Sequence, residues 1–238
     1  MSVSLEVTDL NSGYGEASVL EGVSFNAEAG EIIAVVGANG AGKTTLLNTI
    51  AGVVPPRSGS IKLGDEDIAR IPAHKLPSKG LTLVPEGGRL FPFMTVRENL
   101  EVGGFCKRGT PEFTRGLDEV MQLFPILGKR QNQLAGLLSG GERQMCAVAR
   151  AVMSQPQLIM LDEPSVGLSP KLVHEVFELV RSLAGKKGLT VLLVEQNVAE
   201  ALEVSDRAYV LDHGQIVRAA PSSELADDPA IRAAYMGL

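Results

Sequence analysis

The chain has 238 residues, of which 45% are hydrophobic and 21% are charged, as expected for one large α/β domain or a domain carrying a subdomain. Its 22 lysines and arginines against 28 aspartates and glutamates give a formal net charge of −6, which argues against a nucleic-acid-binding surface. We expect no signal peptide, and no apolar stretch approaches the roughly 20 residues of a membrane span. Cys106 and Cys146 are isolated in the sequence and are expected to be reduced, cytosolic thiols.

The first part of the chain predicts strands that lead into a glycine-rich loop. Apolar and polar residues alternate over 3–8 and again over 23–27, which is typical of strands with one solvated face. The continuous apolar run over 31–36 predicts a buried parallel strand. Leucines and isoleucine then recur at helical spacing over 46–51, and Gly52 is expected to end that helix.

The middle of the chain predicts a helical insertion. A strand is expected over 81–84, and helices with little strand over about 92–153. Thr95 and Glu98 have the spacing of a capping box, and Thr110 precedes a proline at the first position of a helix. We therefore expect a single domain over 1–238, with a core at about 1–85 and 155–238 and a helical lobe at about 92–153.

The last third predicts a return to the parallel sheet. Apolar runs at 158–161 and 189–194 have the character of buried strands, and apolar positions over 172–183 mark one face of a helix between them. This order predicts a right-handed parallel crossover. A short strand near 207–211, a turn at 212–214 and helices to the end are expected to follow.

The glycine-rich loop has the GxxxxGK[ST] pattern of a phosphate-binding P-loop, between a predicted strand and a predicted helix. Glycines let the backbone N–H groups turn toward phosphate oxygens at a helix N-terminus. Lys43 is expected to reach the β- and γ-phosphates, and the Thr44 hydroxyl to ligate Mg²⁺. A chance glycine-rich turn is the disfavoured alternative. The predicted nucleotide contacts here are Gly37, Ala38, Asn39, Gly40, Ala41, Gly42, Lys43, Thr44 and Thr45.

An acidic pair follows the apolar run at 158–161. Asp162 is expected to point toward Mg²⁺ from the carboxyl end of a strand beside the P-loop strand. Glu163 is then placed near the γ-phosphate, where it would polarise the attacking water as a general base. The alternative is a solvated acidic pair in a turn.

Residues 138–144, Leu-Ser-Gly-Gly-Glu-Arg-Gln, resemble the signature of the ATP-binding cassette (ABC) ATPases. Ser139 stands where a helix N-cap belongs, and an ordinary N-cap is the alternative interpretation. The resemblance implies an α/β P-loop NTPase fold with a RecA-like parallel-sheet core, an antiparallel N-terminal β part and an inserted helical subdomain. It also implies a head-to-tail ATPase dimer in which Ser139, Gly140 and Gly141 face the γ-phosphate held by the partner.

Several positions match this family and others depart from it. Tyr14 matches the aromatic residue of the family's adenine-stacking loop, although packing on the domain edge is an alternative. Glu86 replaces the usual glutamine that senses Mg²⁺, and Gln196 replaces the histidine that touches the γ-phosphate. Gln196 can donate a hydrogen bond but cannot carry a proton. Ser169 replaces a common aspartate and, before Pro170, also suits an N-cap.

The runs at 84–87, 91–100, 163–170 and 193–197 together resemble an ATPase subunit of the branched-chain amino-acid importers, over essentially the whole chain. This resemblance implies ATP and Mg²⁺ as cofactors, a second ATPase subunit (itself or a sister chain), two membrane permeases and an external binding protein. It implies a place at the cytoplasmic face of the inner membrane, bound through the permeases. Urea and amide importers carry similar motifs.

Two other functions stay open. A soluble ABC ATPase acting on DNA or the ribosome usually has a coiled-coil insertion, tandem cassettes or a basic surface, none of which is evident here. Gln196 and Ser169 would also fit a cassette that mainly binds nucleotide.

Phe91, Phe93 and Met94 form an apolar cluster where the family docks its permease, or else belong to the core of the helical lobe. Three histidines, His74, His174 and His213, have no metal-ligand spacing and are expected at the surface.

Overall fold

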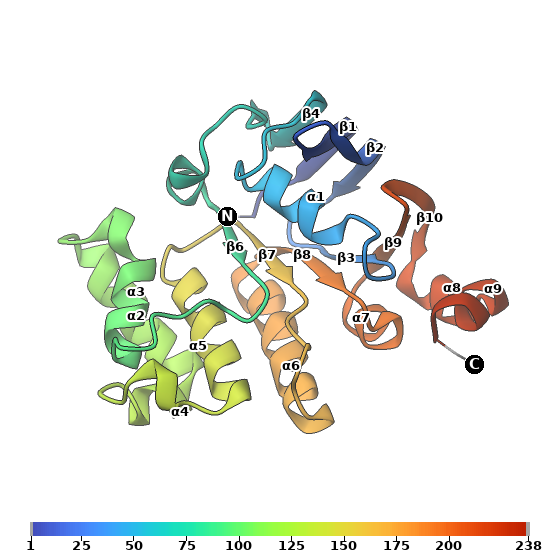
Figure 1. Cartoon of the computed structure of the whole chain (residues 1–238). Helices are drawn as coiled ribbons and strands as arrows, with labels where there is room; N and C mark the ends of the chain where they lie inside the picture. Colours follow the sequence, from blue (N-terminus) through green and yellow to red (C-terminus); the bar gives the residue numbers. More distant parts are fainter. Residues whose placement is uncertain (1, 237–238) are drawn as a thin grey trace.

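The structure is a computed structural model that describes residues 2–236, and it contains two sheets with a group of helices to one side (Figure 1). The smaller sheet has the strand order β2-β1-β4-β5 and is antiparallel. Its strands are β1 (Leu5–Tyr14), β2 (Ala17–Ala27), β4 (Ser58–Leu63) and β5 (Glu66–Asp67). The alternation over 3–8 and 23–27 thus correctly predicts β1 and β2, whereas β4 and β5 are not predicted.

The larger sheet has the order β10-β9-β3-β8-β7-β6. Its strands are β3 (Ile32–Val36), β6 (Leu81–Val84), β7 (Leu158–Asp162), β8 (Thr190–Glu195), β9 (Arg207–Asp212) and β10 (Gln215–Pro221). All neighbours pair in parallel except β9 and β10, which are antiparallel. The apolar runs predict β3, β7 and β8 correctly, because every residue of these three strands is buried. The prediction that the strand ending at Asp162 lies beside the P-loop strand is wrong, because β8 lies between β7 and β3.

The tail departs from the prediction of helices directly after the turn at 212–214. There β10 comes first, as an edge strand with mostly exposed side chains. It is held by backbone pairing with β9 and not by a buried apolar face, so hydrophobic periodicity does not mark it. The helices α8 (Ser222–Asp227), α9 (Pro229–Ile231) and the π-helix η5 (Arg232–Met236) follow.

Two apolar cores lie on opposite faces of the larger sheet. Ile33 and Val35 of β3 pack in the core shared with the smaller sheet and α1 (Lys43–Ile50), whereas Ala34 and Val36 pack in the other. This second core also takes residues from α6 (Pro170–Lys187) and α7 (Val198–Val204). The sheet is therefore covered on both faces, which explains its continuous apolar strands.

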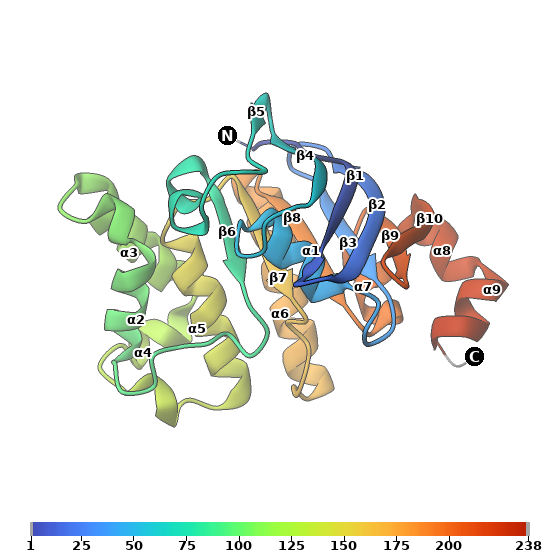
Figure 2. The same cartoon turned by 45° about the horizontal axis from the view of Figure 1, so that its top comes forward.

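The helical lobe, defined here as residues 96–152, stands beside the edge strand β6 (Figures 1 and 2). It comprises α2 (Val96–Gly103), η3 (Phe105–Lys107), α3 (Pro111–Leu123), α4 (Pro125–Lys129), η4 (Ala135–Leu137) and α5 (Gly140–Val152). Thr95 and Glu98 form the predicted capping box, and Thr110 is the N-cap of α3. Between β4 and the lobe lie η1 (Ala73–Lys75) and η2 (Pro77–Lys79).

Across residues 2–236, no helix has both the length and the apolar character needed to cross a membrane. Both cysteines are free, with Cys106 exposed and Cys146 buried. His74, His174 and His213 are all exposed, as predicted.

Candidate nucleotide-binding site

The glycine-rich loop connects the buried strand β3 to the first turn of α1. A Cβ atom at Gly37 would lie 2.2 Å from the backbone oxygen of Leu211, so only glycine fits there. Gly42 has a φ of 108°, which L side chains rarely adopt, and α1 begins at the next residue. The loop therefore presents a helix N-terminus at the carboxyl edge of the sheet, an arrangement that suits an anion.

A cavity of about 570 Å³ opens at this edge. Three strand ends contribute to it, because Glu86 follows β6, Glu163 follows β7 and Gln196 follows β8. Carboxyl ends of parallel strands meet at one edge of a sheet, which is where such folds bind ligands. The lining residues are Val19, Asn39, Gly40, Gly42, Lys43, Thr44, Thr45, Glu86, Glu163, Val166 and Gln196.

Lys43 is a buried cation that lines this cavity. Its side chain is 4% exposed, and its Nζ donates to the carbonyl oxygens of Gly37 at 2.9 Å and Ala38 at 3.2 Å. The same nitrogen lies 3.1 Å from Oε1 of Glu163. One ammonium group therefore joins the glycine loop to the predicted general base.

Thr44 and Asp162, two of the predicted metal ligands, lie together. The Thr44 hydroxyl donates to Oδ1 of Asp162 at 3.2 Å. Burial raises the pKa of Asp162 to about 6, and the nearby carboxylates of Glu163 and Glu86 add to this effect. A divalent cation would offset the repulsion among the carboxylates of Asp162, Glu163 and Glu86. Hydroxyl and carboxylate oxygens are also the ligands that Mg²⁺ prefers.

Within residues 2–236, no three acidic, histidine or cysteine side chains converge as a metal site. The Thr44 hydroxyl and the Asp162 carboxylate suit Mg²⁺, which proteins often bind through one or two carboxylates together with phosphate oxygens and water. Glu86 is exposed and lines the cavity, so its predicted role as a metal ligand stays a prediction.

Glu163 occupies a strained position. Its φ of 46° is in the left-handed region, where residues other than glycine are uncommon. The end of β8 holds the turn on both sides of Pro164. The N–H of Glu163 donates to the Val194 oxygen at 2.9 Å, and the N–H of Ser165 donates to Oε1 of Glu195 at 2.9 Å. Such strain persists where the surroundings over-determine it, as at functional sites.

The signature residues lie apart from this cavity. Ser139 is the N-cap of α5, and its hydroxyl accepts the Glu142 N–H at 3.4 Å in a capping box. A Cβ atom at Gly141 would lie 2.7 Å from the Leu172 side chain, so this glycine allows α5 to pack closely on α6. Among the described residues that line the cavity, neither the signature nor Tyr14 is present, and Tyr14 is 52% exposed.

The loop carrying Glu86 is held by residues that the sequence did not predict to have a role. Arg150 of α5 donates to the carbonyl oxygens of Gly88 at 2.6 Å and Arg89 at 3.0 Å, and its guanidinium lies 5.9 Å from the centre of the Phe91 ring. The fully buried Asn99 of α2 binds both backbone groups of Phe91. The sequence signals of these contacts are an asparagine and an arginine at positions that continue the apolar faces of α2 and α5.

Beyond Phe91, the same loop carries an exposed apolar surface. Phe93 is 90% exposed and Phe91 48%, while Met94 is partly buried. The interpretation of Phe93 as core of the lobe is therefore wrong. The Gly136 N–H donates to the Pro92 oxygen at 3.0 Å, so this surface is joined to the segment that leads into the signature.

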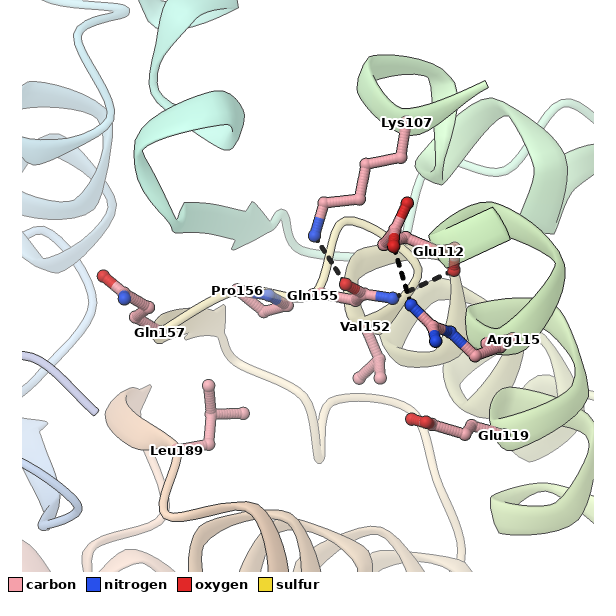
Figure 3. A pocket seen from close by; sticks show the side chains of 9 residues that line it. All are labelled: Lys107, Glu112, Arg115, Glu119, Val152, Gln155, Pro156, Gln157 and Leu189. Carbon is pink, nitrogen blue, oxygen red and sulfur yellow. Dashed lines mark hydrogen bonds and ion pairs between the residues drawn. The ribbon is translucent and has the colours of Figure 1, made fainter. Parts of the chain in front are cut away.

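A second cavity, of about 650 Å³, lies at the opposite edge of the sheet, between the lobe and the residues that precede β7 and β8 (Figure 3). Hydrogen bonds and one ion pair connect several of its polar side chains. Lys107 donates to Oε1 of Gln155 at 2.6 Å, Gln155 donates to the Glu112 carbonyl at 3.1 Å, and Arg115 binds the Glu112 carboxylate at 2.6 Å. This cavity takes no part in the nucleotide site.

Known proteins match this chain over more than half of its length or over nearly all of it. The family model described as ABC transporter matches residues 20–166. The chain is 43% identical over 233 residues to the high-affinity branched-chain amino acid transport ATP-binding protein BraG of Pseudomonas aeruginosa, with 98% of this chain and 99% of that protein covered. It is 34% identical over 235 residues to the lipopolysaccharide export system ATP-binding protein LptB of Haemophilus influenzae, with coverage of 98% and 97%.

Solved structures of ATP-binding cassettes have a fold similar to that of this chain. An ATP-binding cassette of an ABC transporter in its ADP conformation superposes with a TM-score of 0.84 at 28% identity, covering all of both chains. A dimeric cassette in a post-hydrolysis state, bound to ADP and phosphate, gives a TM-score of 0.80 at 25% identity over 92% of this chain and 98% of that one.

Proposed function

Because this chain belongs to the ABC transporter family of ATP-binding proteins, as the family match and whole-length relatives establish, we propose that it energises import of branched-chain amino acids. The family hydrolyses ATP to drive transport. The part that we propose here is the identity of the cargo. The observation that supports this choice of cargo is the similarity to BraG over nearly the whole of both chains. The LptB relative serves lipopolysaccharide export, so the family alone does not select a cargo.

In the proposed mechanism the P-loop binds the phosphates of ATP. Backbone N–H groups at the start of α1 face the phosphate oxygens, and Lys43 neutralises the β- and γ-phosphates. Its short distances to Gly37, Ala38 and Glu163 support this role, since they place the ammonium at the mouth of the loop. Mg²⁺ would be held by Thr44 and Asp162 and would offset phosphate charge.

Glu163 is the proposed general base. Its carboxylate lines the cavity beside Lys43, where it can accept a proton from the water that attacks the γ-phosphate. Gln196 lines the same cavity from the end of β8 and would donate a hydrogen bond to the γ-phosphate or to that water. No proton passes through Gln196, because an amide cannot take one up at neutral pH.

The second half of each site is proposed to come from another ATPase chain. ABC ATPases of transporters dimerise and act with membrane permease subunits, and one of the similar solved structures is such a dimer. The Ser139 N-cap, Gly140 and Gly141 stand at the N-terminus of α5, outside the P-loop cavity of their own chain. This separation supports their predicted contact with the γ-phosphate bound by the partner.

We further propose that the exposed Phe93 and the neighbouring Phe91 contact the permease. Large apolar side chains exposed on the same loop are typical of interaction sites. The chain would then bind the cytoplasmic face of the inner membrane through two permeases, which receive cargo from an external binding protein.

The test is a transporter reconstituted from this chain, its permease subunits and a binding protein. ATP turnover should rise when the binding protein carries leucine, isoleucine or valine. Stimulation by urea or short amides in place of these amino acids would assign the other cargo. Turnover that responds to none of these would contradict an importer of either kind.

A further inference from the structure

A buried glutamate, Glu195, lies at the end of β8 and contacts the turn that carries the proposed base. Its side chain is 0% exposed, although glutamate is among the residues least often buried. Oε1 accepts the Ser165 N–H at 2.9 Å, whereas Oε2 is buried without a hydrogen-bond partner among residues 2–236. A carboxyl group in this setting is costly, so packing alone does not explain it.

The hydrogen bond of Oε1 lies on the turn that carries the base. Glu163 has a φ of 46°, and two residues later Ser165 is bound by Glu195. On the N-terminal side of Pro164, the Glu163 N–H donates to the Val194 oxygen at 2.9 Å. Val194 and Glu195 are consecutive in β8, so one strand end fixes the turn before and after Pro164.

We propose that Glu195 is a positioning residue for hydrolysis: its Oε1 accepts the Ser165 N–H and thereby keeps Glu163 in its left-handed conformation beside Lys43. The same bond fixes the start of segment 165–169, which leads to α6. Val166 in this segment is 50% exposed and lines the cavity. Loss of the acceptor would let the turn relax, and the Glu163 carboxylate would leave the line of attack on the γ-phosphate.

Burial raises the pKa of Glu195 to about 7, with the Glu163 carboxylate contributing in the same direction. Both the protonated and the ionised carboxyl group offer an oxygen acceptor, so the anchor exists in either form. Glutamine has the same length and keeps this acceptor without the charge. Leucine has a similar volume and no acceptor.

The experiment compares Glu195→Gln with Glu195→Leu in the assembled transporter complex. The Gln variant should keep kcat within about threefold, and the Leu variant should lose tenfold to about 100-fold in kcat, because small displacements of a catalytic group cost that much. KM for ATP should change less than about twofold in both, since the P-loop is untouched. Normal kcat in a folded Leu variant, or an equal loss in both variants, would overturn the proposal.

A fluorescence reporter measures the position of the segment directly. The chain has no tryptophan, so Val166→Trp would introduce the only one. In this background Glu195→Leu should lower the fluorescence anisotropy and Glu195→Gln should leave it unchanged. Equal anisotropy in all three proteins would refute the anchor. If neither Glu195→Leu nor Glu195→Ala folds while Glu195→Gln does, Glu195 serves folding and the positioning role is overturned.

The inference rests on the proposed role of Glu163 as base, so Glu163→Gln is measured in parallel. Full turnover in Glu163→Gln would remove the base assignment itself. Arrested turnover in that variant, together with normal turnover in Glu195→Leu, would refute only the positioning role.

Discussion

Replacing the buried Glu195 with glutamine should remove a pH-dependent loss of stability. The pKa of this group is raised from 4.5 to about 7, with burial as the main cause. At about 1.4 kcal/mol for each pH unit between the two values, the difference corresponds to about 3 kcal/mol. Below pH 4.5 the group is protonated in both the folded and the unfolded chain, so it has no effect on the pH dependence there.

As the pH rises from 4.5, the unfolded chain releases its proton while the folded protein must keep the group neutral. The stability present below pH 4.5 is therefore lost progressively, and the loss is complete once the pH exceeds the folded pKa of about 7. Glutamine has no proton to lose. Relative to the wild type, Glu195→Gln should thus gain about 3 kcal/mol in free energy of unfolding between pH 4.5 and 8.

The assay is urea denaturation of the nucleotide-free, metal-free protein at pH 5, 6, 7 and 8, followed by circular dichroism. The difference in free energy of unfolding between variant and wild type should rise with pH, most steeply up to pH 7. A difference that stays constant from pH 5 to 8 would show that the folded protein ionises Glu195 at its ordinary pKa. A difference that falls would reverse the sign and refute the burial argument.

Three further predictions concern the loop, the lobe and the apolar surface. Gly37→Ala should destabilise the fold by about 2 kcal/mol or more, because its Cβ would meet the Leu211 oxygen at 2.2 Å. The matched Gly40→Ala, in open space at φ 84°, should cost only about 1 kcal/mol in thermal or urea unfolding; equal costs would contradict this account. Arg150→Lys should raise the Mg²⁺ concentration for half-maximal hydrolysis by about threefold to thirtyfold, because a lysine ammonium cannot reproduce the forked pair of hydrogen bonds to the loop carrying Glu86. Its control is Arg97→Lys, which alters an exposed pair with Glu101 and should leave the Mg²⁺ titration unchanged. Phe93→Ser should change folding stability by less than about 0.5 kcal/mol, since its side chain is 90% exposed, but should abolish co-purification with the permeases. Phe105→Ser, at an exposed apolar position that follows α2, is the comparison, and intact co-purification of the Phe93 variant would refute the docking proposal.

Much of the larger sheet is predictable because its strands are buried on both faces. The runs at 31–36, 158–161 and 189–194 are continuous in apolar residues, and the structure places β3, β7 and β8 there. The exposed edge strand β10 has no such pattern. It is held by backbone hydrogen bonds to β9, and these do not depend on apolar side chains that a sequence pattern could reveal. The tail is where prediction failed for this reason.

The candidate site also contains some residues that the sequence predicts and others that it does not. Short-range spacing identifies the P-loop and the acidic pair, and the structure brings Lys43, Thr44, Asp162 and Glu163 together. The contacts of Glu195 with Ser165 and of Arg150 with Gly88 span 30 and 62 residues. Periodicity in the sequence does not reveal contacts between residues that are so far apart along the chain. Burial of a glutamate is visible only once the strand that carries it is placed inside the sheet.

The central claim is that Glu163, held beside Lys43, activates water for hydrolysis of ATP. The most direct measurement is turnover and ATP binding by Glu163→Gln in the assembled complex. We expect ATP to bind with unchanged affinity and to keep the two ATPase chains associated, while kcat falls by about 100-fold or more, as for loss of a general base. Turnover at the wild-type rate in this variant, with ATP bound normally, would contradict the account.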